Sequence, residues 1–173
     1  MKELPEIRLR PLRVDDAFVT WNWRNHPMVR EYFSGHGEEV TLVDEQDWVH
    51  RQMKSDQDGV TFCVEDALSG LLVGMTFLKK IDRRNRQAEF AILIDPSQSG
   101  KGYGIAACLA TLREAFSSYT LHRVYLKVRT DNEAANRLYD RCGFMKEGIL
   151  RDDHFKNGRY YDQYIMSVLD QGK

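Results

Sequence analysis

The stretch AEFAILIDPSQSGKGYGIAA, residues 88–107, decides the fold of this chain. It reads as a β-strand that stops at Asp95-Pro96, followed by a glycine-rich loop and the start of a helix. Glycines at 100, 102 and 104 allow positive φ and close approach, so consecutive backbone N–H groups converge in front of the helix dipole. Lys101 adds a positive charge. The pattern predicts a site for the phosphate or pyrophosphate of a cofactor.

The glycine spacing alone is compatible with other kinds of turn. Gly102-x-Gly104-x-x-Ala107 matches the G-x-G-x-x-A pattern of a Rossmann-type dinucleotide-binding protein. That pattern usually lies in the first strand–helix turn of its domain, whereas roughly ninety residues precede this one. The P-loop pattern G-x-x-x-x-G-K-(S/T) is absent from the sequence. A glycine turn that binds nothing is the third alternative.

A second motif follows a predicted helix at 105–117 and a predicted strand at 122–128. It is NEAANRLYDRCGF, residues 132–144. Together with the glycine loop it resembles the GNAT superfamily of acetyl-CoA-dependent N-acetyltransferases, whose members carry a (Q/R)-x-x-G-x-(G/A) loop and then N-x-x-A-x-x-x-Y-x-x-x-G-F. The matching residues are Gly102, Gly104, Asn132, Ala135, Tyr139, Gly143 and Phe144. The family's Gln or Arg position falls on Ser99, with Gln98 one residue earlier.

This resemblance implies a single N-acetyltransferase domain over residues 1–173, of the α/β (α+β) class. The expected sheet is mixed, mostly antiparallel and twisted, with one splayed pair of strands and helices on its flanks. Hydrophobic patterning predicts strands at 6–12, 60–64, 72–81, 87–94, 122–128, 145–155 and 160–169. It predicts helices at 15–25, 28–33, 43–54, 105–117 and 132–142. Asn157-Gly158 predicts a tight turn between the last two strands.

The resemblance also implies acetyl-CoA as a cosubstrate. Its pantetheine arm is expected beside Leu93 and Ile94, where a bulge splays the strand and a backbone N–H near Leu93 points at the thioester oxygen. Asn132 is expected to contact the arm; it can also cap the following helix, and the two roles can coexist. The pyrophosphate is expected on the backbone of Ser99, Gly100, Lys101, Gly102, Tyr103 and Gly104.

Two residues are candidates for the chemistry of acetyl transfer. Tyr139 is the candidate general acid, because a free tyrosine has a pKa of about 10, close to that of the departing alkyl thiol. Its alternative is a tyrosine that only packs its ring against the sheet. Glu89 interrupts an apolar strand shortly before the expected thioester site, so it is the candidate general base or ammonium anchor. Its alternative is a salt bridge, with Arg84 or Arg86.

The acceptor is less well specified by the sequence. Segments such as Arg83-Arg84 and Ala88-Glu89-Phe90 resemble the branch with spermidine and ribosomal-protein N-acetyltransferases, with spermidine ranked first. Trp23-Arg24-Asn25-His26-Pro27 resembles enzymes that acetylate amino groups of nucleotide-linked sugars. Trp21 and Trp23 wall a pocket or, as we favour, pack in the core. Spaced carboxylates suit a polyamine, although acids at helix starts are equally typical of solvated faces; these are Glu31, Glu38, Glu39, Asp44 and Glu45.

Composition narrows the class of partner. A net charge of −1 and a pI of about 6.5 argue against a nucleic-acid binder. No apolar run is long enough for a membrane span, and the first residues lack the apolar core of a signal peptide. We therefore expect a cytoplasmic enzyme with a small-molecule amine substrate, and the sequence is compatible with a homo-oligomer. The three cysteines predict buried or partly buried free thiols, and the histidine spacing predicts no metal site.

Overall fold

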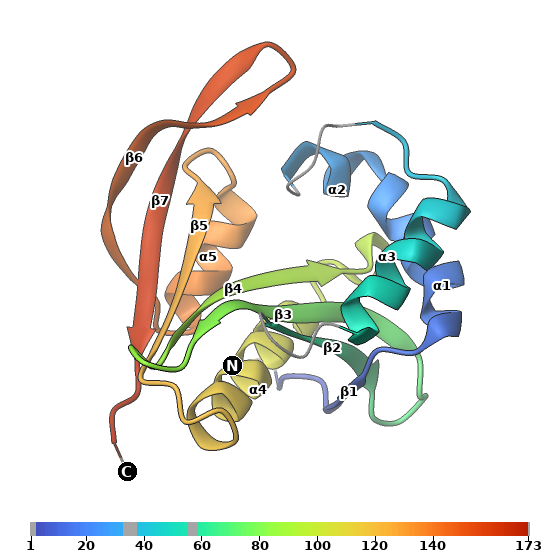
Figure 1. Ribbon diagram of the computed structural model, residues 1–173, viewed down its shortest axis with the longest axis horizontal. Helices are drawn as coiled ribbons and strands as arrows, with labels where there is room; N and C mark the ends of the chain where they lie inside the picture. The colour runs from blue at the N-terminus through green and yellow to red at the C-terminus, as the bar shows by residue number, and fades with distance from the viewer. Residues whose placement is uncertain (1–2, 33–37, 55–58, 173) are drawn as a thin grey trace.

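The computed structural model describes residues 3–32, 38–54 and 59–172. Seven strands form one sheet in the order β1-β2-β3-β4-β5-β7-β6 (Figure 1). The strands are β1 (Ile7–Pro11), β2 (Gly59–Asp66), β3 (Leu72–Asp82), β4 (Gln87–Ile94), β5 (Arg123–Arg129), β6 (Met145–Lys156) and β7 (Arg159–Leu169). The α-helices are α1 (Ala17–Asn25), α2 (Pro27–Tyr32), α3 (Leu42–Lys54), α4 (Tyr103–Ser117) and α5 (Glu133–Arg141). Short 3-10 turns, η1 (Val14–Asp16) and η2 (Pro96–Gln98), precede α1 and the glycine loop.

The predicted mixed sheet with a splayed pair is confirmed. Every neighbouring pair is antiparallel except β4 and β5, which are parallel. These two strands pair only where residues 87–89 lie opposite residues 123–125. Beyond that point they diverge, and the rest of β4 leaves β5 at a wide angle (Figure 1). The divergence opens a wedge in the middle of the sheet.

The expected bulge lies on a different strand. β4 pairs with β3 in continuous register from Glu89 to Ile94, so this part of β4 is regular. The register shift falls on β3 between Lys79 and Asp82, opposite the start of β4. Lys80, at that shift, has a φ of 51°, in the left-handed region. An extra residue in one strand bends it and increases its twist, so the irregularity on β3 replaces the predicted bulge on β4.

Helices cover both faces of the sheet. On one face, α4 and α5 pack on Ala88 and Phe90 of β4 and on the buried side chains of β5. On the other, α1 and α3 pack on β2 and β3 and on Leu93 of β4. Because side chains alternate along a strand, even-numbered residues of β4 face α4 and α5, and odd-numbered ones face α1 and α3. We call these the α4–α5 face and the α1–α3 face.

Most predicted elements are confirmed within a few residues. Thr41 and Asp44 form a reciprocal cap at the start of α3: Asp44 N–H donates to Thr41 Oγ1 at 3.1 Å and Thr41 N–H donates to Asp44 Oδ2 at 3.1 Å. Asn157 and Gly158 both have positive φ and form the predicted turn between β6 and β7. Helix α4 begins two residues earlier than expected. Residue 33 of the predicted helical turn and the predicted loop at 55–58 lie outside the described residues.

Candidate active site

The backbone of β4 presents polar groups to the wedge. Asp95 N–H donates to Val73 O at 2.9 Å, and antiparallel hydrogen-bonded pairs alternate, so Leu93 bonds to Met75 of β3. The backbone groups of Phe90, Ile92 and Ile94 therefore face the side from which β5 has diverged. Buried backbone groups need partners, and an extended chain with amide groups can supply them like an added strand. Next to Leu93, Ile94 turns its N–H toward the wedge, and the expected contact with the thioester oxygen stays a prediction.

The glycine loop has the geometry expected of an anion cradle. Gly100 and Gly102 have φ of 75° and 96°, and Gly102 is the N-cap of α4. A Cβ on Gly104 would lie 2.6 Å from Leu138 Cδ1, so the Leu138 side chain of α5 would have to shift to make room for it. The first-turn N–H groups of α4 have no acceptor inside the helix. These observations fit the pyrophosphate of acetyl-CoA, and the assignment of the loop stays a prediction.

The side chains of this loop serve local contacts. Lys101 Nζ donates to Gln98 Oε1 at 2.9 Å, and Ser99 is exposed. Tyr103 donates its hydroxyl proton to Asp66 Oδ2 at 2.8 Å, which ties the start of α4 to the β2–β3 turn. This bond raises the pKa of Tyr103. Anion binding here thus depends on the backbone rather than on the side chain of Tyr103.

Replacing Gly102 with Glu is expected to raise the KM for acetyl-CoA about tenfold or more relative to Gly102→Ala. Both variants place a side chain at a positive φ, at a cost of about 1–2 kcal/mol, and 3.0 Å from Pro5 Cδ. Only the glutamate adds a negative charge beside the expected phosphates. The comparison of KM and melting temperature in the two variants isolates the charge. Equal KM values in both folded variants would remove the pyrophosphate assignment.

Helix α5 carries the second motif. Asn132 is its N-cap, with Oδ1 accepting from Ala135 N–H at 3.2 Å. This hydrogen bond confirms the capping role of Asn132. It uses the side-chain oxygen, so the side-chain nitrogen can still donate to the cofactor arm. Asn136, one turn further, is 8% exposed and places Nδ2 near the carbonyl oxygens of Arg129, Thr130 and Asn132. Sequence analysis did not select Asn136.

Tyr139 lies in the α4–α5 core at the wedge. Its ring centroid is 6.3 Å from that of Phe90 and 5.6 Å from that of Phe144, both in edge-to-face geometry. Burial, with a smaller contribution from Cys108 and Cys142, raises the pKa of the phenol, so it holds its proton at neutral pH. The phenol is therefore protonated, as a general acid must be, but its raised pKa no longer matches that of the departing alkyl thiol. Its ring packing is observed as well. The catalytic role of Tyr139 stays a prediction.

Glu89 lies at the last residue pair before the wedge opens, on the α1–α3 face. Its carboxylate accepts from Lys80 Nζ at 2.7 Å. The salt bridge that sequence analysis allowed is present, but the partner is Lys80 on the β3 bulge, not Arg84 or Arg86. The Lys80 side chain is 72% exposed, so this ion pair is weak and an incoming ammonium can replace it.

Glu89 and Tyr139 therefore approach the wedge from opposite faces of the sheet. An amine that enters from the α1–α3 face meets the carboxylate, and a thiolate that departs on the α4–α5 face meets the phenol. Ile94 N–H lies on the same edge of β4, where it can donate to a developing oxyanion. This arrangement suits the transfer of an acyl group from a thioester to an amine.

The residues expected to hold the acceptor are mostly structural. Glu45 is fully buried and accepts from Thr20 Oγ1 at 2.6 Å and Arg24 Nη1 at 2.8 Å, so its assignment to substrate was wrong. Asn25 holds the backbone of Val40 through two hydrogen bonds. Trp23 is 5% exposed in the core, as favoured, and Trp21 Nε1 donates to Val40 O. Asp44 caps α3, whereas Glu38 and Glu39 are exposed.

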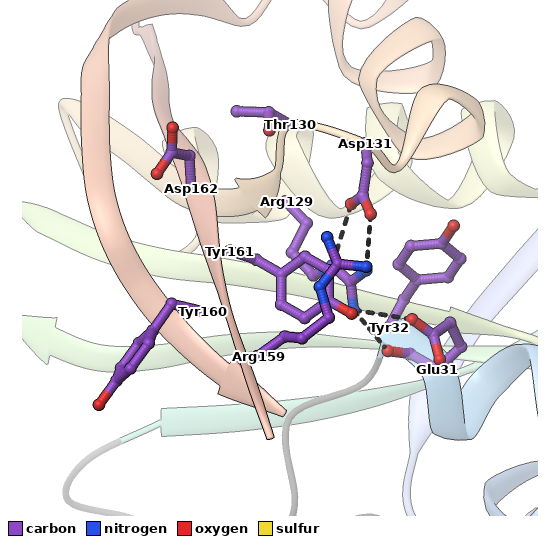
Figure 2. A pocket seen from close by; sticks show the side chains of 9 residues that line it. All are labelled: Glu31, Tyr32, Arg129, Thr130, Asp131, Arg159, Tyr160, Tyr161 and Asp162. Carbon is purple, nitrogen blue, oxygen red and sulfur yellow. Dashed lines mark hydrogen bonds and ion pairs between the residues drawn. The ribbon is translucent and has the colours of Figure 1, made fainter. Parts of the chain in front are cut away.

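A pocket of about 530 Å³ lies at the end of β5, beside α2 and the start of β7 (Figure 2). At its centre Arg129, whose side chain is 4% exposed, is paired with Asp131 at 2.6 Å and with Glu31 at 2.9 Å. Its guanidinium carbon lies 3.6 Å from the ring centroid of Tyr161 and 4.9 Å from that of Tyr32. Sequence analysis found Glu31 but missed its partner; an arginine that ends an apolar strand next to Asp131 was the available signal.

Other expectations concern cysteines, metals and membranes. Cys63, Cys108 and Cys142 are buried free thiols, as predicted. Within the described ranges, no group of three or more His, Cys, Asp or Glu residues is arranged to hold a metal ion. In the same ranges, no helix has both the length and the apolar character needed to cross a membrane.

Comparison with known proteins identifies the family. A family model of the acetyltransferase (GNAT) domain matches residues 6–145. The chain is 34% identical to spermidine N(1)-acetyltransferase of Vibrio cholerae serotype O1, over 95% of this chain and 93% of the relative.

Solved structures of that relative are also similar. The crystal structure of spermidine N-acetyltransferase from Vibrio cholerae in complex with CoA and spermine matches with a TM-score of 0.86 and 32% identity, over 94% of this chain and 95% of that one. A dodecameric structure of the enzyme in an intermediate state matches with a TM-score of 0.79 and 32% identity, over 94% and 93%. The chain belongs to the GNAT family and is an N-acetyltransferase that uses acetyl-CoA as its acetyl donor.

Proposed function

We propose that this enzyme acetylates a primary amine of a polyamine such as spermidine. The observation that carries the proposal is the similarity, along nearly the whole chain, to an enzyme solved with CoA and spermine. Acetylation of a ribosomal-protein N-terminus or of a sugar amine are the alternatives. The sugar alternative rested on Trp23-Arg24-Asn25, and in this fold those side chains hold α1 to residue 40 and α3.

The proposed reaction uses the two faces of the sheet. Glu89 anchors the substrate ammonium and accepts its proton, directly or through water, so that the neutral nitrogen attacks the thioester carbon. Ile94 N–H donates to the oxyanion that forms. As the carbon–sulfur bond breaks, Tyr139 gives its proton to the thiolate, and the nitrogen releases its second proton to water. Glu89 then passes its proton to solvent, and solvent restores the proton of Tyr139. The products are the N-acetyl amine and CoA.

The wall of the acceptor side is acidic and aromatic. The pocket in Figure 2 contains three carboxylates, three tyrosine rings and two arginines, and Arg129 is paired with two of the carboxylates, Glu31 and Asp131, which leaves Asp162 outside these ion pairs. Alkylammonium groups bind favourably to carboxylates and to aromatic faces. Glu38 and Glu39 add exposed carboxylates next to α3. Spaced negative charge of this kind supports an acceptor that carries several positive charges along an alkyl chain.

An amine panel tests the proposal. Spermidine and spermine are expected to be acetylated with kcat/KM at least tenfold above that of a monoamine of similar length, measured by release of free CoA. The preference should weaken as salt rises, because exposed charges are screened over about 8–10 Å at physiological ionic strength.

Exchanging Glu38 and Glu39 together for Gln should weaken the preference further, without changing the KM for acetyl-CoA. The matched control exchanges Asp15 and Asp47 for Asn, two exposed acidic residues outside the pocket and away from the glycine loop. Turnover of a peptide N-terminus or a sugar amine, with inert polyamines, would identify one of the alternatives instead.

We also propose that the enzyme is a cytoplasmic homo-oligomer. The edge strand β6 exposes Met145 and Ile149 at 75% and 56%, and exposed apolar side chains on an edge strand favour association. A related enzyme is dodecameric in one of its solved structures. Three free buried thiols are typical of a reducing compartment. Light scattering after gel filtration measures the oligomeric state directly.

A further inference from the structure

Asn136 holds a buried hydrogen-bond acceptor whose partner is missing among the described residues. The residue is 8% exposed, and Oδ1 contacts no donor there. An unsatisfied buried acceptor costs about 1–3 kcal/mol, and native proteins keep few of them. Such an atom indicates a ligand, in particular when it lies beside a candidate active site.

The orientation of this amide is determined by its surroundings. Nδ2 lies 3.1 Å from Arg129 O, 3.3 Å from Thr130 O and 2.9 Å from Asn132 O. Exchanging nitrogen and oxygen would place Oδ1 against three carbonyl oxygens, which cannot donate. The three carbonyls therefore fix Nδ2 on the loop between β5 and α5. Oδ1 is held in place before any ligand arrives, so its partner must be a donor from outside the described fold.

The helix places this acceptor between the two candidate residues of α5. Residues 132, 136 and 139 follow the i, i+4, i+7 spacing of one helix face. Asn132 is the candidate contact of the pantetheine arm, and Tyr139 is the candidate proton donor to the sulfur. A chain that runs from Asn132 to Tyr139 along this face passes Asn136.

The spacing also selects a group on that chain. Asn136 and Tyr139 are three residues apart, a rise of about 4.5 Å along the axis. In the pantetheine arm the amide nitrogen nearest the sulfur is separated from it by an ethylene unit, an extended span of about 4 Å. This amide carries an N–H, which is the donor that Oδ1 requires. The second amide of the arm lies several bonds further from the sulfur.

We propose that Asn136 Oδ1 accepts a hydrogen bond from the pantetheine amide N–H nearest the sulfur and so positions the thioester beside Tyr139. In the same amide group, Nδ2 bonds to carbonyl oxygens of the loop between β5 and α5, while Oδ1 accepts the hydrogen bond from the cosubstrate. Asn136 is a positioning residue in this scheme and takes no proton. The proposal rests on the assigned path of the arm along α5 and does not depend on which amine is acetylated.

A double-mutant cycle on CoA binding, carried out without any amine substrate, tests the proposal. We would measure the Kd of CoA by calorimetry for the wild type and Asn136→Ala, with CoA and with an analogue in which an ester oxygen replaces the N–H of the amide nearest the sulfur. In the wild type the ester is expected to weaken binding about tenfold. In Asn136→Ala the same change is expected to raise the Kd less than about twofold, because the side chain that accepts the hydrogen bond has already been removed. Any effect of the substitution on the loop itself cancels in the cycle.

Two controls complete the cycle. The analogue with the ester at the second amide should show the same penalty in both proteins. Asn22→Ala removes an exposed helical asparagine whose Nδ2 donates to Phe18 O at 3.1 Å, and it should keep the full wild-type ester penalty. If Asn136→Ala does not fold, Asn136→Leu, which also lacks a hydrogen-bond acceptor, replaces it. Equal penalties in the wild type and the Asn136 variant, or coupling only at the second amide, would overturn the proposal.

Discussion

Tyr139→Phe is expected to lower kcat roughly 100-fold while leaving the Kd for CoA almost unchanged. Removing a general acid typically costs a factor of this size or more. Phenylalanine keeps the ring contacts with Phe90 and Phe144, so the core remains filled. The loss should therefore appear in kcat and not in stability. Steady-state kinetics with saturating acetyl-CoA, together with a melting curve, measure both quantities.

A second tyrosine provides the matched control. Tyr119 is also a partly buried core tyrosine, in edge-to-face contact with Phe62, and burial raises its pKa as well. It lies at the far end of α4, away from the wedge, so Tyr119→Phe should turn over normally. Near-normal kcat in Tyr139→Phe would mean that Tyr139 only packs its ring against the sheet.

Arg24→Ala is expected to lower the free energy of unfolding by about 3 kcal/mol. Glu45 is fully buried, and Arg24 is its charged partner, with Thr20 supplying one further hydrogen bond. Removing the guanidinium leaves a buried carboxylate without a compensating charge, which is far more costly than losing a surface pair. Urea denaturation measures the change.

The charge argument can be separated from lost packing by a double variant. Arg24→Ala combined with Glu45→Gln removes both charges and should recover much of the lost stability. The exposed pair of Arg137 and Glu133 is the control, since Arg137→Ala should cost less than about 0.5 kcal/mol. A loss of stability that Glu45→Gln leaves unchanged would assign the effect to the contact of the Arg24 guanidinium with the Trp48 ring, whose centroid lies 5.1 Å from the guanidinium carbon.

The fold was predictable because its signals are local. The glycine loop, the Asn157-Gly158 turn and the motif that begins at Asn132 each specify a short backbone geometry, and each lies where the sequence placed it. The splayed strand pair came from the family resemblance, since periodicity does not report how far two strands stay paired.

The parts that were missed depend on contacts between distant segments. Arg129 is buried through Glu31, which is 98 positions away, and through Tyr161. The bulge at Lys80 depends on register with β4, and the buried state of Glu45 depends on Arg24 of another helix. The sequence does not distinguish an acidic residue at a helix start that is exposed to solvent from one that is buried against an arginine. Charge alone therefore overstated the acidic surface available to a substrate.

The short pairing between β4 and β5 divides the sheet into two parts, which we expect to behave as separate cooperative units. One contains β1 to β4 with α1 and α3, and the other contains β5, β7 and β6 with α5. The two parts are joined by three residue pairs and by the shared core under α4. An ion pair between Arg129 and Glu31 and a hydrogen bond from Lys156 Nζ to Arg30 O also connect them. A ligand that fills the wedge bridges both units, so part of its binding free energy becomes coupling between them. We therefore expect the two parts of the enzyme to unfold in a single cooperative transition more completely when a ligand occupies the wedge.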